Sequence, residues 1–481
     1  MRRVQLYDSM QRTTRLFQPL VPPRVGMFVC GLTPYAEAHL GHGRFAVVFD
    51  VVARALRHWG YRVLYVQNVT DLDDKVIRRA AEIGVDPLEL SARNFRSWRQ
   101  LMEQMNITSV DHYPFATDYV PEIIEQVQQL ETAGLAYVAD DGSVYYEVAK
   151  FPAYGHLSGQ KIESLRPGAR LEIDRRKHAP EDFVLWKAAT PGEPSWESPW
   201  GPGRPGWHIE DTAIAGRLLG SRYDLHGGGL DLIFPHHEAE IAQMEGASGR
   251  SPLVQYWMHN GLLLMGGEKM AKSTGNVYSL AEALEHFGSM PLRFYYLNAH
   301  YRSPLEYSAG ESLEASREAY ERMRGPYERV ARAMVSASVD GEDLPSAAAS
   351  ESERVVAQMD EFMANDFATR EAVAALFGWT RTVLEFDARL TELSLGALET
   401  LAAPFEYAAK VLGLFVDVES RAVGPLDAIV RAAIAARTRA RSRGDYAEAD
   451  RIRAELEQAG VRLEDGASGT RWTLQSGGLP D

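Results

Sequence analysis

The sequence has a single cysteine, Cys30, among its 481 residues. A disulfide within the chain is therefore excluded, and a lone thiol suits a reducing compartment, where it is inert, a metal ligand or a nucleophile. The chain also lacks a run of 18 apolar residues and, after Met1, the apolar stretch of a signal peptide. We therefore expect a cytoplasmic protein that makes no membrane contact.

Positive charge is also scarce, because 51 Lys and Arg residues face 66 Asp and Glu residues, for a formal net charge of −15. This balance argues against a protein that coats nucleic acid. The segment 426–481 differs, because its nine arginines equal its nine acidic residues. Five of these arginines fall in one stretch that has no acidic residue, namely Arg431, Arg437, Arg439, Arg441 and Arg443. The stretch is either a solvated helix face or a contact to the phosphates of a nucleic acid.

A strand, a helix and a second strand are predicted near the start of the chain. The apolar run that includes Cys30 is typical of a buried strand. Apolar residues then recur every three or four positions from Phe45 to Trp59, which predicts a helix that ends at Gly60. The β-branched and aromatic run 61–69 predicts a parallel second strand. Ligands of such folds bind outside the carboxyl ends of the strands, so we expect a site beside Cys30.

The length predicts about three domains at roughly 150 residues each. We expect an α/β class, with a Rossmann-like parallel-sheet domain over 1–304 that carries an inserted segment near 116–205. Within the insertion, the Pro-, Gly- and Trp-rich stretch 187–206 predicts an irregular loop around a cleft. Amphipathic helices over 305–420 predict a helical bundle, and 426–481 predicts a small α/β domain.

Two histidines stand where the loop after the first strand enters the helix, in the motif His39-Leu40-Gly41-His42. A helix N-terminus favours anions, and imidazole donors stabilise charge that builds on a phosphate. His39, Gly41 and His42 are therefore candidates for nucleotide binding and catalysis. The alternative is that the histidines only cap the helix.

A second cationic motif, Lys269-Met270-Ala271-Lys272-Ser273, lies between glycines in the segment 265–276. A glycine-flanked loop that closes over pyrophosphate could place Lys269 and Lys272 on its phosphates. The alternative is a solvated lysine loop.

Together, the two motifs resemble the HIGH and KMSKS signatures of class I aminoacyl-tRNA synthetases. Further blocks, among them FVCGLTPYAEAHLGHGR, YVQNVTDLDDKV, GWHIED, HGGGLDLIFPHHEAEIAQ and WMHNGLL, resemble cysteinyl-tRNA synthetases nearly from end to end. The resemblance implies ATP-dependent ligation of L-cysteine to a cysteine tRNA through a cysteinyl-adenylate, with Mg²⁺ accompanying ATP and with AMP and pyrophosphate as products. It further implies a catalytic domain over 1–304, a bundle on the tRNA side, an anticodon-recognising tail and a monomer.

The resemblance also implies a zinc ion that binds the substrate thiolate. Cys30, His236 and Glu240 match three ligands, while the fourth position, a cysteine in the family, is Asp211 here. Three anionic ligands and a neutral histidine would still leave a net charge of −1 with Zn²⁺. A carboxylate is a harder and weaker donor than a thiolate, so we expect weaker zinc binding. The alternatives are that the site has lost its metal, or that Cys30 is only a buried strand residue.

The remaining site residues follow from the resemblance alone. Asn68 and Thr70 would orient the amino and carboxylate groups of the substrate, and Trp207 would pack against its side chain. His226, Gly229 and Asp231 would approach adenosine, with Asp231 accepting hydrogen bonds from the ribose. The alternative for each of these residues is a purely structural role.

Two other functions stay open from the sequence. One is a paralogue that joins cysteine to a small amine, against which the bundle and the arginine-rich tail argue. The other is a tRNA-binding relative without catalysis, for which Asp211 would be the first sign and against which both intact motifs argue.

Overall fold

The computed structural model describes residues 1–160, 176–270, 277–308, 310–338, 340–418, 425–443, 445–459, 461–466 and 469–474. The chain divides into two compact units. The first unit consists of Met1–Arg317, Asp360–Val373 and Lys410–Gly413, and the second of Glu318–Met359, Ala374–Ala409 and Leu414–Asp481. Among the described residues, no helix is both long and apolar enough to span a bilayer.

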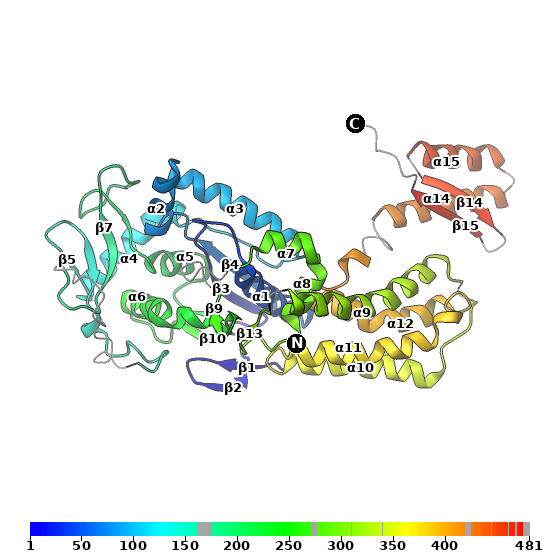
Figure 1. Cartoon of the computed structure of the whole chain (residues 1–481), viewed down its shortest axis with the longest axis horizontal. Helices are drawn as coiled ribbons and strands as arrows, with labels where there is room; N and C mark the ends of the chain where they lie inside the picture. The colour runs from blue at the N-terminus through cyan, green and yellow to red at the C-terminus, as the bar shows by residue number, and fades with distance from the viewer. Residues whose placement is uncertain are drawn as a thin grey trace. The chain divides into compact units, whose positions relative to one another are not determined.

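A four-stranded parallel sheet lies at the centre of the first unit (Figure 1). Its strand order is β10-β9-β3-β4, so β3 is an inner strand and the first of the four along the chain. The helix α1 connects β3 to β4, which confirms the predicted strand–helix–strand unit and the α/β class. The bounds are β3 (Arg24–Leu32), α1 (Leu40–His58), β4 (Arg62–Val69), β9 (Tyr223–Gly229) and β10 (Val254–Asn260).

The remaining elements of this unit pack around the sheet. A short antiparallel hairpin, β1 with β2, precedes the sheet, and a small mixed sheet of order β12-β11-β13 follows it. The bounds are β1 (Gln5–Asp8), β2 (Thr13–Leu16), α2 (Asp74–Ile83), α3 (Pro87–Gln104), α5 (Ile209–Leu219), η4 (Leu230–Leu232), η5 (Ile233–His237), α6 (Glu238–Ser248), β11 (Leu263–Met265), β12 (Glu268–Lys269), α7 (Leu280–Phe287), α8 (Ser289–Leu297) and β13 (Leu305–Glu306).

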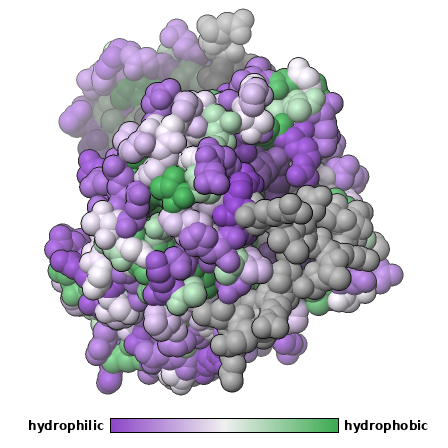
Figure 2. All heavy atoms as spheres, turned by 90° about the vertical axis from the view of Figure 1, so that its left-hand side faces the viewer, coloured by the Kyte–Doolittle hydropathy of each residue, from purple (hydrophilic) through white to green (hydrophobic). Residues whose placement is uncertain are grey.

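The inserted segment forms its own antiparallel sheet of order β5-β6-β7-β8. The prediction of an irregular loop over 187–206 was wrong at both ends, because β7 ends within this segment and β8 lies inside it. Gly203 permits this pairing, since a Cβ atom there would lie 2.2 Å from the indole nitrogen of Trp186. The face of the molecule in Figure 2 carries mainly hydrophilic residues, with apolar ones scattered among them. The bounds are η1 (Ala116–Tyr119), α4 (Val120–Thr132), β5 (Ala136–Val138), β6 (Val144–Tyr146), η2 (Val148–Lys150), β7 (Phe183–Ala188) and β8 (Gly203–Pro205).

Long helices follow, and aromatic contacts hold part of them together. Tyr327 stacks on Phe405 with ring centroids 4.9 Å apart, and the Trp379 indole donates to the Leu401 carbonyl at 3.0 Å. The bounds are α9 (Glu311–Ser336), α10 (Ser346–Ala364), α11 (Thr369–Glu385), η7 (Asp387–Arg389), α12 (Leu395–Tyr407) and η8 (Ala408–Leu412).

The last part of the chain has two helices and an antiparallel hairpin around a small apolar core. Val430, Val461 and Leu463 form that core, and Trp472 packs against it. The bounds are α14 (Pro425–Ser442), α15 (Tyr446–Gln458), β14 (Val461–Gly466) and β15 (Gly469–Leu474).

Candidate active site and metal centre

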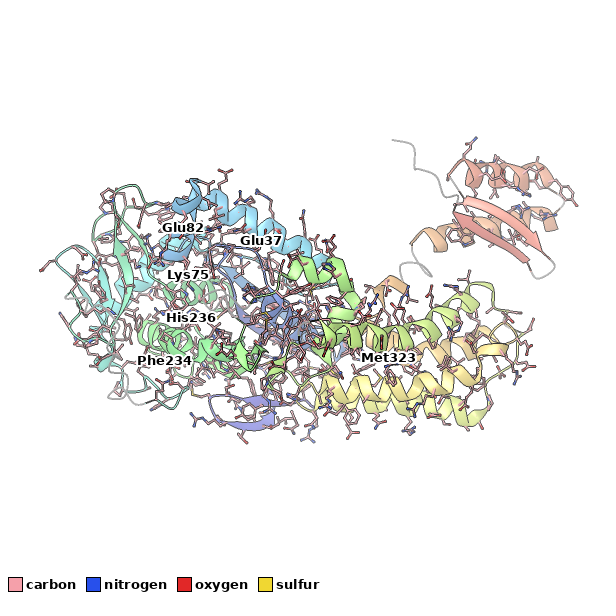
Figure 3. The ribbon with its side chains drawn as sticks, in the orientation of Figure 1. Glu37, Lys75, Glu82, Phe234, His236 and Met323 are labelled. Atoms are coloured by element: carbon pink, nitrogen blue, oxygen red, sulfur yellow. The ribbon has the colours of Figure 1, made fainter. Side chains whose placement is uncertain are left out.

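Four buried side chains with metal-ligand chemistry meet near the carboxyl end of β3. Cys30 comes from β3, Asp211 from the first turn of α5, His236 from η5 and Glu240 from the first turn of α6. Their ligand atoms all lie within 4.8 Å of one another. The Nε2 atom of His236 lies 2.9 Å from Asp211 Oδ2 and 3.2 Å from Glu240 Oε1. The structure therefore brings together the four residues predicted as zinc ligands, and Figure 3 shows where His236 lies in the unit.

The geometry of this set depends on a break in the chain before α6. Phe234 has an extended backbone, with φ of −135° and ψ of 133°, and the helical course resumes at Pro235. His236 and Glu240 are consequently one turn apart on the same side of a helix, as the four-residue spacing predicts.

A second donor set shares two members with the first. His226 and His237 place their Nε2 atoms 3.2 Å and 3.3 Å from the Cys30 sulfur. These two histidines, Cys30 and Glu240 also lie within 4.8 Å of one another by their ligand atoms. His226 was expected beside adenosine, and the structure instead places it against this sulfur, with its Nδ1 atom 2.7 Å from the Tyr223 hydroxyl.

Sequence reasoning missed three further histidines of this region. His237 lies 2.8 Å from His259 through Nδ1 and Nε2, and His259 reaches the Ser9 hydroxyl at 2.8 Å. His208 touches the His236 ring through Nδ1. The segments PHHEAE, WMHN and GWHIED each contain one of these histidines and could have indicated them, but only the fold shows that the three side chains converge.

Burial controls the charge of the first set. Burial, followed by the nearby charges of Glu240 and Asp211, raises the pKa of the Cys30 thiol well above its usual value. Burial also raises the pKa of Glu240 to about 7, against the opposing effect of His236. Burial alone would lower the pKa of His236, but Glu240 and Asp211 together raise it well above its usual value. This charge balance suits a divalent cation, which would take the place of protons on these groups.

The HLGH motif forms the N-terminus of α1. His39 is the N-cap residue and its Nδ1 atom accepts from the Gly41 amide at 3.1 Å, while His42 Nδ1 accepts from the His39 amide at 3.1 Å. The helix-capping alternative therefore describes a real part of their role. His39 also lines a cavity of about 500 Å³ beside Tyr35 and Ser279.

Two residues predicted to bind ATP separately are joined in this structure. The Lys269 ammonium lies 2.6 Å from Asp231 Oδ2, and both side chains are partly exposed. Gly266 and Gly267 have φ of +64° and +79°, which makes a tight turn between β11 and β12. Gly229 ends β9, two residues before Asp231. Lys272 lies outside the described residues.

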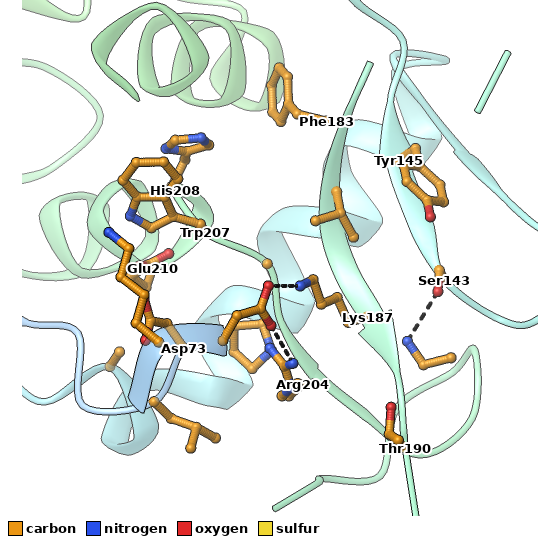
Figure 4. A pocket seen from close by; sticks show the side chains of 18 of the residues that line it. Asp73, Ser143, Tyr145, Phe183, Lys187, Thr190, Arg204, Trp207, His208 and Glu210 are labelled. Carbon is orange, nitrogen blue, oxygen red and sulfur yellow. Dashed lines mark hydrogen bonds and ion pairs between the residues drawn. The ribbon is translucent and has the colours of Figure 1, made fainter. Parts of the chain in front are cut away.

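Of the substrate-contact candidates, Trp207 lines a cavity of about 580 Å³ (Figure 4). Trp207 is 42% exposed, its ring stacks 5.2 Å from His236, and the Lys75 ammonium lies 5.6 Å from its centre. Asn68 and Thr70 are buried and contact each other at 3.3 Å, and the Thr70 hydroxyl donates to Glu210, which lines the same cavity.

The arginine-rich stretch splits into two kinds of residue. Arg437 is 4% exposed and donates to the Thr470 hydroxyl at 3.3 Å, so it belongs to the core side of α14. Arg439, Arg441 and Arg443 are exposed. The side chain of Arg431 lies outside the described residues.

Family models and solved structures both match the chain. Residues 16–318 match the family of class I tRNA synthetase (C) catalytic domains, and residues 424–472 match the cysteinyl-tRNA ligase anticodon binding domain. A solved Mycobacterium tuberculosis methionyl-tRNA synthetase has a TM-score of 0.58 at 16% identity, over 81% of this chain and 92% of its own. A solved putative arginyl-tRNA synthetase from Campylobacter jejuni has a TM-score of 0.54 at 15% identity, over 81% and 93%. Both likenesses show the class I fold.

Curated relatives match almost the whole chain. A cysteine–tRNA ligase of Alkalilimnicola ehrlichii is 46% identical over 98% of this chain and 99% of its own length. A cysteine–tRNA ligase of Methylococcus capsulatus is 44% identical over the same shares. With the catalytic-domain model covering most of the sequence and such relatives covering nearly all of it, the chain belongs to the cysteinyl-tRNA synthetase family of class I aminoacyl-tRNA synthetases.

Proposed function

We propose that this chain ligates L-cysteine to a cysteine tRNA in two steps, through a cysteinyl-adenylate formed from ATP with its Mg²⁺. The observation that carries the proposal is the buried set of Cys30, Asp211, His236 and Glu240 at the carboxyl ends of a class I sheet. A sulfur, a nitrogen and two carboxylates at this place suit recognition of a thiol better than recognition of an apolar side chain.

The residues present fit a zinc ion. Zinc prefers four ligands drawn from thiolate, imidazole and carboxylate, and this set supplies one thiolate, one imidazole and two carboxylates. The buried Oε2 atom of Glu240 makes no hydrogen bond of good geometry among the described residues, although it lies 3.2 Å from the Nε2 atom of His226, and this leaves it able to bind a cation. When bound, zinc would supply a Lewis-acidic contact to the substrate sulfur, which a serine hydroxyl of similar volume matches poorly.

The chain's own residues supply positioning and cationic stabilisation for the adenylation step. His39 and His42 stand at the amino end of α1, where the helix dipole favours the α-phosphate of ATP. Lys269 and Lys272 approach the phosphates when the loop 265–276 closes, so Lys269 exchanges its contact with Asp231 for a phosphate, and Asp231 becomes available to the ribose. No protein nucleophile is needed, because positioning and charge stabilisation suffice for attack on a phosphate.

The tail would recognise the anticodon part of the tRNA. This proposal is supported by the match to the anticodon binding domain and by the exposure of Arg439, Arg441 and Arg443. Arginines on an exposed helical surface contact phosphates locally even though the whole chain is acidic. We further propose that the protein acts as a cytoplasmic monomer, with a tRNA-side bundle over 305–420 between the catalytic domain and the tail at 426–481.

Cysteine-dependent pyrophosphate exchange and tRNA charging by the purified chain test this function. We expect exchange with cysteine, at least a hundredfold less with serine, and transfer of cysteine to tRNA. Exchange without transfer to tRNA, together with product formation from a small amine, would support the paralogue instead. Binding of tRNA without any exchange would support a non-catalytic relative.

A further inference from the structure

A directional hydrogen-bond chain leads from the sheet to α5. The Asn68 amide donates to the Thr70 hydroxyl at 3.3 Å, and that hydroxyl donates to Glu210 Oε1 at 3.3 Å. Asn68 donates its other amide hydrogen to Asp211 Oδ1. The Oδ1 atom of Asn68 accepts from the Gly31 amide at 2.6 Å. Both amide hydrogens of Asn68 and the single hydroxyl hydrogen of Thr70 are therefore committed within the protein.

Glu210, which ends this chain, is buried and incompletely partnered. The residue is 2% exposed, and its Oε2 atom has no hydrogen-bond partner among the described residues. Its side chain lines the cavity of about 580 Å³, together with Asp73, Trp207 and His208 on the side shown at the left of Figure 4. A buried carboxylate oxygen without a donor is costly, so this position calls for a donor from a ligand.

The other two carboxylates that line this cavity in the described part of the chain are already in use. Asp73 caps α2 through a 2.8 Å contact to the Val76 amide. Asp74 pairs with Arg204 at 2.6 Å and with Lys187, and Figure 4 shows Lys187 and Arg204 to the right of Glu210. Glu210 therefore faces the same cavity as Asp73, while Lys187 and Arg204 are paired with Asp74.

We propose that the side-chain carboxylate of Glu210 binds the α-ammonium group of the amino acid. Asn68 and Thr70 would hold the Glu210 carboxylate in position, because Thr70 donates to it and Asn68 donates to Thr70. This inference rests on the proposed function. Asp211, the next residue along α5, belongs to the set proposed to hold the zinc that binds the substrate's sulfur. The first turn of α5 would therefore contribute to binding both the thiol and the amine of cysteine. Thr70 and Asn68 then act through Glu210 and Asp211, which assigns them a positioning role in place of the direct substrate contacts expected from the sequence.

Binding of three thiols to the zinc-loaded full chain, measured by calorimetry, tests the inference. The probes are L-cysteine, cysteamine, which keeps the amine but lacks the carboxylate, and 3-mercaptopropionate, which keeps the carboxylate but lacks the amine. In Glu210→Gln we expect binding of cysteine and cysteamine to weaken by about 10- to 100-fold, because a buried charge pair is lost. Binding of 3-mercaptopropionate should stay within about twofold of the parent.

Two further variants separate recognition from folding. Glu210→Asp keeps the charge and should retain part of the preference for amine-bearing ligands. Glu238→Gln is the matched control, because Glu238 is 1% exposed and its oxygens accept from the Gly155 and Ser158 amides at 2.9 and 2.7 Å. It should leave the ratio of cysteine to 3-mercaptopropionate affinity at the parental value.

The outcomes distinguish the two proposals. Equal weakening of all three ligands by Glu210→Gln, or no weakening of any, would overturn the role of Glu210 and leave the proposed function standing. A parent chain that neither binds cysteine nor exchanges pyrophosphate with it would overturn the proposed function and this inference together.

Discussion

The imidazole of His236 lies 2.9 Å from Asp211 through Nε2 and Oδ2, and the second oxygen of the same carboxylate accepts from Asn68. Asp211 thus fills the place of a family cysteine with a side chain that serves two neighbours at once. A carboxylate has two oxygens for such a division, whereas a thiolate offers a single sulfur atom.

This relationship predicts that Asp211→Cys binds zinc more tightly and still activates cysteine. The formal charge of the ligand set is unchanged by the exchange, while the softer sulfur donates more strongly to zinc. Asp211→Ala removes a ligand and should lower both zinc content and discrimination against serine. Metal stoichiometry of the parent and both variants after matched exposure to a chelator decides this. A zinc-free parent that still selects cysteine over serine would contradict a metal-based mechanism.

A second prediction concerns the loop 265–276. Lys272→Ala should lower the rate of cysteine-dependent pyrophosphate exchange by at least 100-fold and change the KM for ATP by only a few fold. The reason is that a closing loop contacts the phosphates most strongly as their charge develops. Lys150→Ala is the control, because Lys150 pairs with Glu147 on the insertion at 2.7 Å. Exchange by Lys272→Ala at the parental rate would show that this loop is no catalytic lid.

The sequence predicts those features of the fold that local patterns encode. The period of three and four after Phe45 marks α1, and the helical spacing of His236 and Glu240 holds in the structure because one turn carries both. The resemblance adds Asp211, which no local pattern connects to Cys30 across 181 residues of chain.

Other features depend on packing between distant segments and could not be predicted from local sequence patterns. The contact of His226 with Cys30 arises because β9 lies beside β3, and the Lys269–Asp231 pair joins the turn after β9 to the hairpin of β11 and β12. Gly43 is another such feature, because a Cβ atom there would lie 2.8 Å from the Tyr296 hydroxyl. Its small size therefore serves the packing of α1.

The split within the arginine stretch gives a third prediction. Replacement of Arg439 and Arg443 by Gln should weaken tRNA binding and charging while leaving pyrophosphate exchange unchanged. Each lost phosphate contact should reduce the slope of log affinity against log salt by roughly 0.7 to 0.9. Arg437→Gln is the contrasting variant, because its buried contact to Thr470 predicts lower stability of the tail. Deletion of 426–481 should have the larger effect of the same kind. Undiminished charging by the deletion variant would rule out a tRNA role for the tail.

The last prediction concerns a buried ion pair between α1 and α8. Asp50 and Arg293 are both 0% exposed and paired, and Arg54 binds the same carboxylate at 2.7 Å. Burial alone would raise the pKa of Asp50, but Arg293 and Arg54, with the Ser109 hydroxyl, lower it below its usual value. A carboxylate whose folded-state pKa is lowered stabilises the fold above its unfolded-state pKa of about 3.9, and this stabilisation disappears as the pH falls through the lower folded-state value.

Asp50→Asn should therefore lower the free energy of unfolding by about 3–5 kcal/mol at pH 7, because Arg293 is left buried without its counter-ion. The difference from the parent should shrink below about pH 4, where Asp50 in the unfolded parent begins to take up a proton while the folded parent still keeps it ionised. Urea unfolding curves of both proteins across this pH range measure the effect. Asp141→Asn provides the control, since the side chains of Asp141 and Arg176 are 36% and 52% exposed, and an exposed pair contributes at most about 1 kcal/mol. An Asp50→Asn effect as small as that of Asp141→Asn, or one that persists unchanged in acid, would contradict the stabilising role of this pair.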